Sequence, residues 1–170
     1  MRQTRRTRPA AFVLAALFAT TALASDPSVA CSMAPPDYVD IEPRPASGGE
    51  GVPPAPALRL EGVRRGNGTR PLTSCSDIGV LSFGMPDDAT AAASIVVFEV
   101  LSSSVETSIV DERPMRPGPP IDGRRYFVFS WIDDAEDAQE PLRMRIRATS
   151  LSESGARGGS VTLEVDDPGR

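Results

Sequence analysis

The residues best placed to do chemistry form one acidic run, Asp133–Glu140, in which five of the eight side chains are carboxylates. Clustered carboxylates on a tight turn supply the hard oxygen ligands that Ca²⁺ prefers, so Asp133, Asp134, Glu136 and Asp137 are the candidate metal ligands. The run does not match an EF-hand loop, because it has no glycine at the sharp turn and no terminal acid at the required distance. The alternative, which we favour, is a solvated acidic turn that keeps a strand edge soluble.

Thiol chemistry is limited to two cysteines, Cys31 and Cys75. In an exported protein an even pair predicts one disulfide, which here would link the N-terminal segment to the first strands. The alternative is acylation of Cys31, since the preceding Ser28-Val29-Ala30 resembles a bacterial lipobox. That alternative would leave Cys75 unpaired, and we favour the disulfide.

Two residue types that most enzymes need are missing from the chain. It contains no histidine, and all 18 of its basic residues are arginine. The familiar serine, cysteine and zinc hydrolases need histidine, while Schiff-base chemistry and P-loop phosphate transfer need lysine. A small hydrolase using a carboxylate pair stays open as an alternative. We expect no catalysis and no cofactor, because no segment carries a catalytic motif.

The first 24 residues predict export. Four arginines precede an apolar run over Ala10–Leu23, and Ala22-Leu23-Ala24 supplies small residues for a signal peptidase. The run is too short to span a bilayer, which takes about 20 apolar residues. We therefore expect a periplasmic or secreted protein with no transmembrane span, or one anchored by lipid through Cys31. The lack of lysine and the abundance of alanine, glycine and proline are typical of a GC-rich bacterial genome.

Removal of residues 1–24 changes the charge balance of the chain. It leaves 14 arginines against 23 acidic residues, a net charge of −9. An acidic surface without a basic patch argues against nucleic acid and anionic lipid as partners.

Behind the signal peptide we expect an irregular arm over residues 25–56 and one β domain over residues 57–167. Seven prolines lie between residues 32 and 57, which is typical of an extended tether. Short β-type runs bounded by glycine, proline and aspartate follow it. They lie at 58–61, 77–83, 94–101, 126–132, 142–148 and 161–165, with a bulge expected between Val80 and Leu81 and a short helix over 88–93.

Two of these runs carry side chains that could bind a ligand. Alternation places Phe127, Phe129 and Trp131 on one face, which we interpret as core; with Tyr126 they could instead form a sugar-stacking platform. Arg143, Arg145 and Arg147 alternate with apolar residues on the other run. They could bind an anionic sugar or a partner's carboxylates, but we expect cross-strand pairing with acids such as Glu164.

The closing segment PLRMRIRATSLSESGARGGSVTLEV resembles the last hairpin of fibronectin type III-like domains, and PPAPALRLEGV is similar to their first strand. The resemblance covers residues 53–167, and it implies an all-β, immunoglobulin-like or fibronectin-like sandwich. Two positions depart from it: Leu142 replaces the expected aromatic corner, and Trp131 lies in a later strand than usual. Such folds bind proteins or glycans or act as spacers, so we expect a non-catalytic envelope module that binds a protein or glycan or gives structural support.

Overall fold

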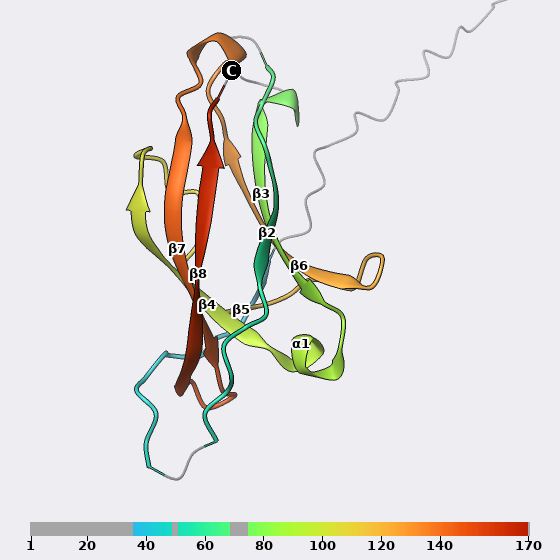
Figure 1. Cartoon of the computed structure of the whole chain (residues 1–170), viewed down its shortest axis with the longest axis vertical. Coiled ribbons are helices and arrows are strands. Elements are labelled where there is room, and N and C mark those ends of the chain that lie inside the picture. The colour runs from blue at the N-terminus through green and yellow to red at the C-terminus, as the bar shows by residue number, and fades with distance from the viewer. Residues whose placement is uncertain (1–35, 49–50, 69–74, 170) are drawn as a thin grey trace, which may run out of the picture. The chain divides into compact units, whose positions relative to one another are not determined.

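The computed structural model describes residues 36–48, 51–68 and 75–169, and these residues form two facing antiparallel sheets (Figure 1). The larger sheet has the order β1-β5-β4-β7-β8, and the smaller has the order β2-β3-β6. The strands are β1 (Asp37–Tyr38), β2 (Arg59–Arg64), β3 (Ile78–Pro86), β4 (Ile95–Ser103), β5 (Met115–Arg116), β6 (Arg124–Ile132), β7 (Leu142–Leu151) and β8 (Arg157–Asp167). The expectation of a two-sheet, all-β protein is confirmed. No helix in the described ranges is long and apolar enough to cross a membrane.

The strands occur where the sequence alternates or is continuously apolar. Residues 142–147 of β7 alternate buried and exposed, as the apolar and arginine positions predict. β4 pairs with β5 on one side and β7 on the other, and its first four residues, Ile95–Phe98, are all buried. The continuous apolar run therefore marks a central strand, as expected.

The bulge expected in β3 is not there. β3 pairs with β6 without interruption from Ile78 to Pro86, so Val80 and Leu81 simply lie on opposite faces. The irregularity in this sheet belongs to β2, where the register shifts between Leu60 and Gly62. Val80 is apolar but only half-buried, and this made the alternation of β3 look broken in the sequence.

The described residues also form three short helices: η1 (Cys75–Asp77), α1 (Ala89–Ala93) and η2 (Glu136–Ala138). The side chain of Asp88 caps α1, because its Oδ1 accepts a 2.7 Å hydrogen bond from the backbone N–H of Ala91. This confirms the helix expected over residues 88–93.

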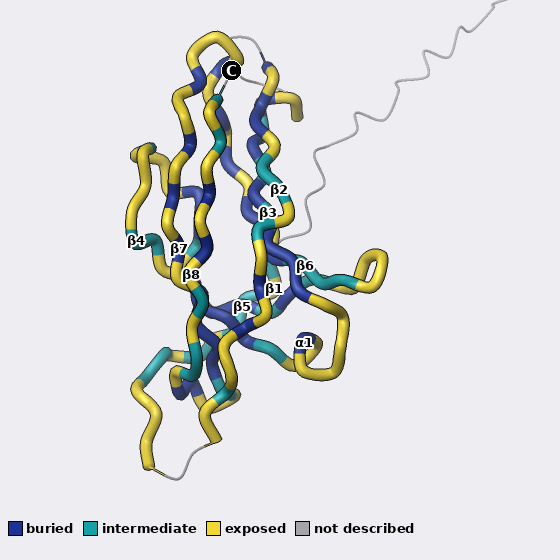
Figure 2. Tube along the Cα trace, in the orientation of Figure 1, coloured by how far each residue is buried: buried dark blue, intermediate teal, exposed yellow. Residues whose placement is uncertain are grey.

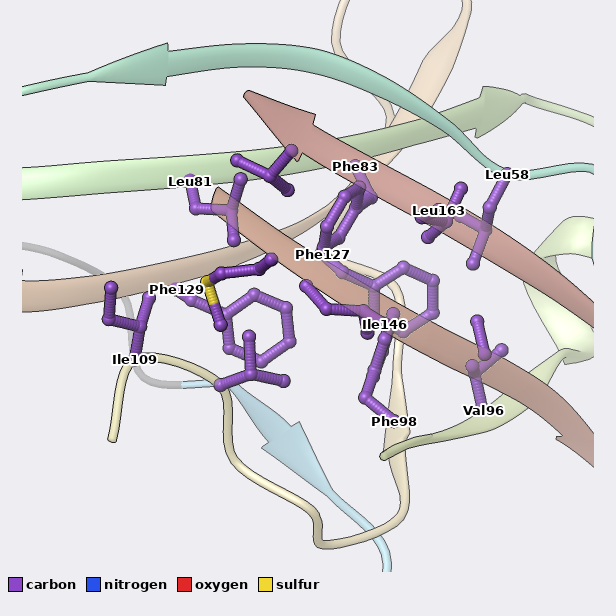
Figure 3. Packing of buried hydrophobic residues seen from close by; sticks show 14 of the residues in the cluster. Leu58, Leu81, Phe83, Val96, Phe98, Ile109, Phe127, Phe129, Ile146 and Leu163 are labelled. Carbon is purple, nitrogen blue, oxygen red and sulfur yellow. The ribbon is translucent and has the colours of Figure 1, made fainter. Parts of the chain in front are cut away.

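The core lies between the two sheets and is centred on four phenylalanines (Figure 3). The ring of Phe98 on β4 lies 5.1 Å from the rings of both Phe127 and Phe129 on β6, measured between centroids. The fourth ring, Phe83, lies 5.8 Å from Phe98. These edge-to-face and stacked contacts connect the small sheet to the large one and fix which face of β6 points inward.

The described part of the N-terminal arm packs on the sandwich. β1 pairs with β5, and Val39 and Ile41 pack against a small apolar cluster of Ile95, Val97 and Leu151. Further along, the arm reaches the start of β8, where Gly159 donates a 2.8 Å backbone hydrogen bond to the carbonyl of Pro53. A Cβ on Gly159 would lie 2.4 Å from the backbone nitrogen of Ala55, so glycine lets the two segments approach.

Candidate functional site: the open edge of β6

β6 is the edge strand of the small sheet, and the main-chain groups on the side that faces away from β3 form the candidate site. The carbonyl of Tyr126 accepts a bond from Gly118, and Arg124 exchanges both of its backbone bonds with Ile121, so these residues point away from β3. In an antiparallel ladder the outward direction alternates along a strand, with N–H and C=O of one residue on the same side. The main-chain groups of Val128, Ser130 and Ile132 therefore also point outward.

A tight turn covers only the first part of this edge. Asp122 and Gly123 both have positive φ, 50° and 73°, which is the conformation of a two-residue hairpin turn. The turn folds the preceding segment onto β6 as far as Tyr126, and it projects from the right of the molecule in Figure 1, where Figure 2 shows it exposed. The edge beyond Tyr126 has no strand against it among the described residues.

The uncovered edge is apolar for an exposed strand. Val128 is 39% exposed and Ile132 is 63% exposed. With Ile121, which belongs to the covering turn, they make three of the four large exposed apolar side chains in the described ranges. Exposed edge strands usually carry charges or proline that prevent pairing, and Val128, Ser130 and Ile132 offer neither.

Two hollows lie between this edge and the segment that follows β4. The first, about 530 Å³, is bordered by Tyr38, residues 108–112 and residues 128–130. The second, about 470 Å³, is bordered by residues 104–107, residues 131–134 and Arg65. Ile109 borders both, so the hollows follow β6 one after the other.

The wall of the first hollow is held by a three-residue cluster. Tyr38 donates a 2.9 Å hydrogen bond to Asp111, and the Arg113 guanidinium lies 3.6 Å above the Tyr38 ring. Hydrogen bonds from the side chain of Arg113 hold the pKa of Asp111 down at about 2, so this carboxylate is ionised at neutral pH. The cluster ties the segment after β4 to β1.

The far end of the second hollow rests on a buried ion pair between Arg65 and Asp133. The guanidinium binds both carboxylate oxygens, with Nε 2.7 Å from Oδ2 and Nη2 2.9 Å from Oδ1, and only 6% and 3% of the two side chains are exposed. The backbone N–H of Gly66 donates a further 2.8 Å bond to Oδ2. Gln139 closes the network by donating to Asp133, to the carbonyl of Asp134 and to the carbonyl of Gly66.

Burial and hydrogen bonding act on Asp133 in opposite directions. Burial raises the pKa of its carboxyl group, but the bonds from Arg65, Gly66 and the Trp131 indole together outweigh it and leave the pKa below the usual value. The pair raises the pKa of Arg65, chiefly through the hydrogen bonds to Asp133. Both groups are therefore charged at neutral pH, and the network fixes the end of β6.

The four candidate calcium ligands differ in their surroundings. Asp133 is buried and bound to Arg65, whereas Asp134, Glu136 and Asp137 are exposed on the turn. Within the described ranges no three acidic, histidine or cysteine side chains are arranged to hold a metal ion. Of the two cysteines only Cys75 lies among the described residues, so the pairing or acylation of Cys31 stays a prediction.

The aromatic residues of β6 and the alternating arginines of β7 have the roles that we favoured from the sequence. Phe127, Phe129 and Trp131 are 2%, 3% and 8% exposed, and they belong to the core. The Arg145 guanidinium lies 3.0 Å from Glu164 on β8, and the arginines on either side pair with Asp166 and Glu99. These arginines are thus held by neighbouring acids on the surface.

The Arg65–Asp133 pair was not expected from the sequence, although one signal for it exists. Inward positions on β6 recur every second residue through Phe127, Phe129 and Trp131, and the next is Asp133. A carboxylate at an inward position needs a buried cationic partner, which could have been sought among the arginines at the end of another strand of the same sheet. No protein-family model matches the chain, and neither a curated protein nor a solved structure is significantly similar to it.

Proposed function

We propose that the protein is an exported, non-catalytic module of the fibronectin type III-like class that binds an extended polypeptide segment along the open edge of β6. The strand order supports this class. In an immunoglobulin-type sandwich the first, second and fifth strands share one sheet, and the third, sixth and seventh share the other. The order β2-β3-β6 against β4-β7-β8 follows that division, with β1 and β5 added beside β4.

The observation that carries the proposed activity is the row of outward main-chain groups at Val128, Ser130 and Ile132. In a constant-type immunoglobulin sandwich the fourth strand pairs at this position, whereas here the fourth strand counted from β2 is β5, which pairs with β4 and leaves this edge without a strand among the described residues. An added strand gains affinity from main-chain hydrogen bonds and specificity from sites for alternate side chains. The two hollows provide such sites.

Two further observations favour a protein ligand over a glycan or a hydrolysed substrate. Of the four aromatic side chains that could stack on a sugar, Phe127, Phe129 and Trp131 are buried in the core. Asp133, the most buried carboxylate of the acidic run, is held ionised by Arg65, so it does not suit a proton donor for hydrolysis.

Export is proposed on the signal-like segment and the acidic mature chain. Mass spectrometry of the mature N-terminus tests it, and the expected result is a chain that starts at Ser25.

Strand addition is tested with a displayed library of random extended peptides selected on the mature chain. We expect selected peptides to slow amide hydrogen exchange at Val128, Ser130 and Ile132. Ser130→Pro should abolish their binding, because proline removes an outward N–H and leaves the ladder to β3 intact. Val52→Lys, which changes an exposed apolar residue elsewhere, should leave binding unchanged. Peptides that bind Ser130→Pro equally well, or that protect other strands, would refute the proposed edge.

A further inference from the structure

We infer that the segment accepted by this edge is the chain's own residues 31–35, which pair antiparallel with β6 and compete there with other chains. The inference rests on the proposed function, and it names the occupant of the edge. Residues 31–35 lie outside the described residues. The assignment follows from where the described chain begins, from how far five residues can reach, and from the sequence of the segment.

The described chain begins beside the uncovered edge. Pro36, the first described residue, borders the hollow of about 530 Å³ together with Val128 and Ser130. Pro36 and Val128 also border a third hollow, of about 280 Å³, on the side of the covering turn. The N–H of Tyr38 donates a 3.0 Å bond to the carbonyl of Pro36, so the chain changes direction between Pro36 and Tyr38. The residues before Pro36 therefore leave from the point where the uncovered edge starts.

The predicted disulfide places the other end of the segment. Cys75 lies two residues before Asp77, whose carbonyl accepts a 2.8 Å bond from the N–H of Asp133. Asp133 directly follows β6, so Cys75 lies near the end of that strand. A disulfide between Cys31 and Cys75, as the sequence predicts, would hold Cys31 at this end of the edge.

The length of the segment leaves little slack between these two points. Cys31 is five residues before Pro36, and five residues span at most about 18 Å when fully extended. The edge from Val128 to Ile132 covers about 13 Å, at about 3.3 Å per residue. A segment tethered at both ends must therefore be nearly extended and run beside β6 in the opposite direction. A separate peptide or a second copy has no such tether, and for this reason we choose the chain's own segment.

The composition of the segment suits an uncharged edge. Residues 27–36 contain no charged side chain, and Val128, Ser130 and Ile132 are uncharged as well. Within the segment, Cys31 and Met33 alternate with small residues, which is typical of a strand with one face toward a core.

This alternation sets the register. The two larger hollows border the inward-facing Phe129 and Trp131, so the apolar pair Cys31 and Met33 should face them. The main-chain groups of the intervening residues then face β6, because both alternate with the same period. With Pro36 beside Val128, Ala34 lies opposite Ser130 and Ser32 lies opposite Ile132. Each of these two pairs exchanges two main-chain hydrogen bonds.

A segment tethered beside the edge competes with every other peptide that could bind there. A short tether gives an effective concentration on the order of mM. Another chain must therefore displace the segment before it can pair with β6. We expect loss of the tether to open the edge and to strengthen binding of other chains.

Amide hydrogen exchange of the mature chain, residues 25–170, tests the pairing. The amides of Ser130 and Ile132 should exchange at least tenfold more slowly in the wild type than in the double variant Cys31→Ser, Cys75→Ser, which removes the tether and leaves no free thiol. The amide of Phe129, which pairs with Leu81 on β3, is the internal reference and should change little. Wild-type protein in which mass spectrometry finds both thiols free would overturn the inference, because the tether would not exist.

Two proline variants test the register. Ser32→Pro removes an N–H that faces β6, so the amide of Ile132 should exchange at least tenfold faster. Met33→Pro is the matched control, because the N–H that it removes points away from β6. Acceleration of Ile132 by both variants equally, or by neither, would refute this pairing.

The outcomes separate the inference from the proposal beneath it. Selected peptides should bind the double variant at least tenfold more tightly than the wild type and slow exchange there, which would support both. Fast exchange of Ser130 and Ile132 in the disulfide-bonded wild type, slowed by selected peptides, would overturn the self-pairing and leave the proposed function standing. Slow exchange in the wild type, with no peptide bound even by the double variant, would support the self-pairing and overturn binding of other chains. Fast exchange that no peptide slows would overturn both.

Discussion

Replacement of Asp133 by alanine should destabilise the protein strongly, because it leaves the Arg65 guanidinium buried without its partner. Only 6% of the Arg65 side chain is exposed, and its Nε and Nη2 donors bond to Asp133. Its Nη1 keeps the carbonyl of Glu140, at 2.9 Å, and a longer contact to Asp167. Removing one partner of a buried ion pair costs about 3–5 kcal/mol, and we expect Asp133→Ala to lie in this range.

Urea denaturation at pH 7 measures the loss. A cost of about 4 kcal/mol, with a slope of about 2 kcal/mol per molar urea, lowers the midpoint by about 2 M. The matched control is Asp134→Ala, which removes the exposed neighbouring carboxylate and should change stability by no more than about 0.5 kcal/mol. A second variant, Arg65→Met with Asp133→Leu, should recover most of the loss, because apolar residues of similar size can replace a buried ion pair.

The pH dependence gives an independent check on the same pair. Because folding lowers the pKa of Asp133, its contribution is present above about pH 4 and is lost as pH falls further. The difference in stability between the wild type and Asp133→Ala should therefore shrink on acidification. If Asp133→Ala costs no more than Asp134→Ala at pH 7, the pair does not anchor β6 and our account of this end of the strand is wrong.

Three further outcomes are expected from the same unfolding assay. Gly79→Ala should cost about 2 kcal/mol or more, within the range of about 1–3 kcal/mol for overpacking of a core, because its Cβ would lie 2.3 Å from the Trp131 ring. Gly62→Ala, whose Cβ would lie 3.9 Å from its nearest neighbour, should cost less than about 1 kcal/mol. Equal losses would refute the steric argument. Asp111→Asn should reduce stability at pH 7 and remove part of the acid sensitivity between about pH 4 and pH 2, since the folded-state pKa is about 2; an unchanged acid profile would contradict this. Arg145→Ala should change stability by less than about 1 kcal/mol, because its ion pair is exposed, and a larger loss would show that the arginine stripe is structural.

Local patterns were enough to predict most of the strands. The alternation in β7, the continuous apolar run in β4 and the aromatic positions of β6 all predict the faces that the structure buries. The signals in β6 and β7 depend on a strand's own period of two, and the run in β4 reflects burial of a central strand on both faces. Val80 misled the same reasoning, because an apolar residue on a half-buried outer face looks like a break in the alternation.

The candidate site depends on relations that no single segment carries. Arg65 and Asp133 are 68 residues apart, and their meeting is fixed by the order of strands in the small sheet. The open edge of β6 likewise exists because none of the described strands pairs with it beyond Tyr126, and an unpaired edge leaves no pattern in the sequence. The sequence therefore predicts that Phe127, Phe129 and Trp131 of β6 belong to the core. It carries no signal that the edge of β6 facing away from β3 is free to pair with another strand.

The contact between the arm and β8 protects part of a sheet edge from association. At Gly159 the arm takes a main-chain donor that would otherwise be open to another molecule. Unpaired groups on an edge strand are templates for pairing with a second chain. Loss of the glycines at the start of β8, which let the arm lie there, would expose this part of the edge and add a site for edge-to-edge aggregation.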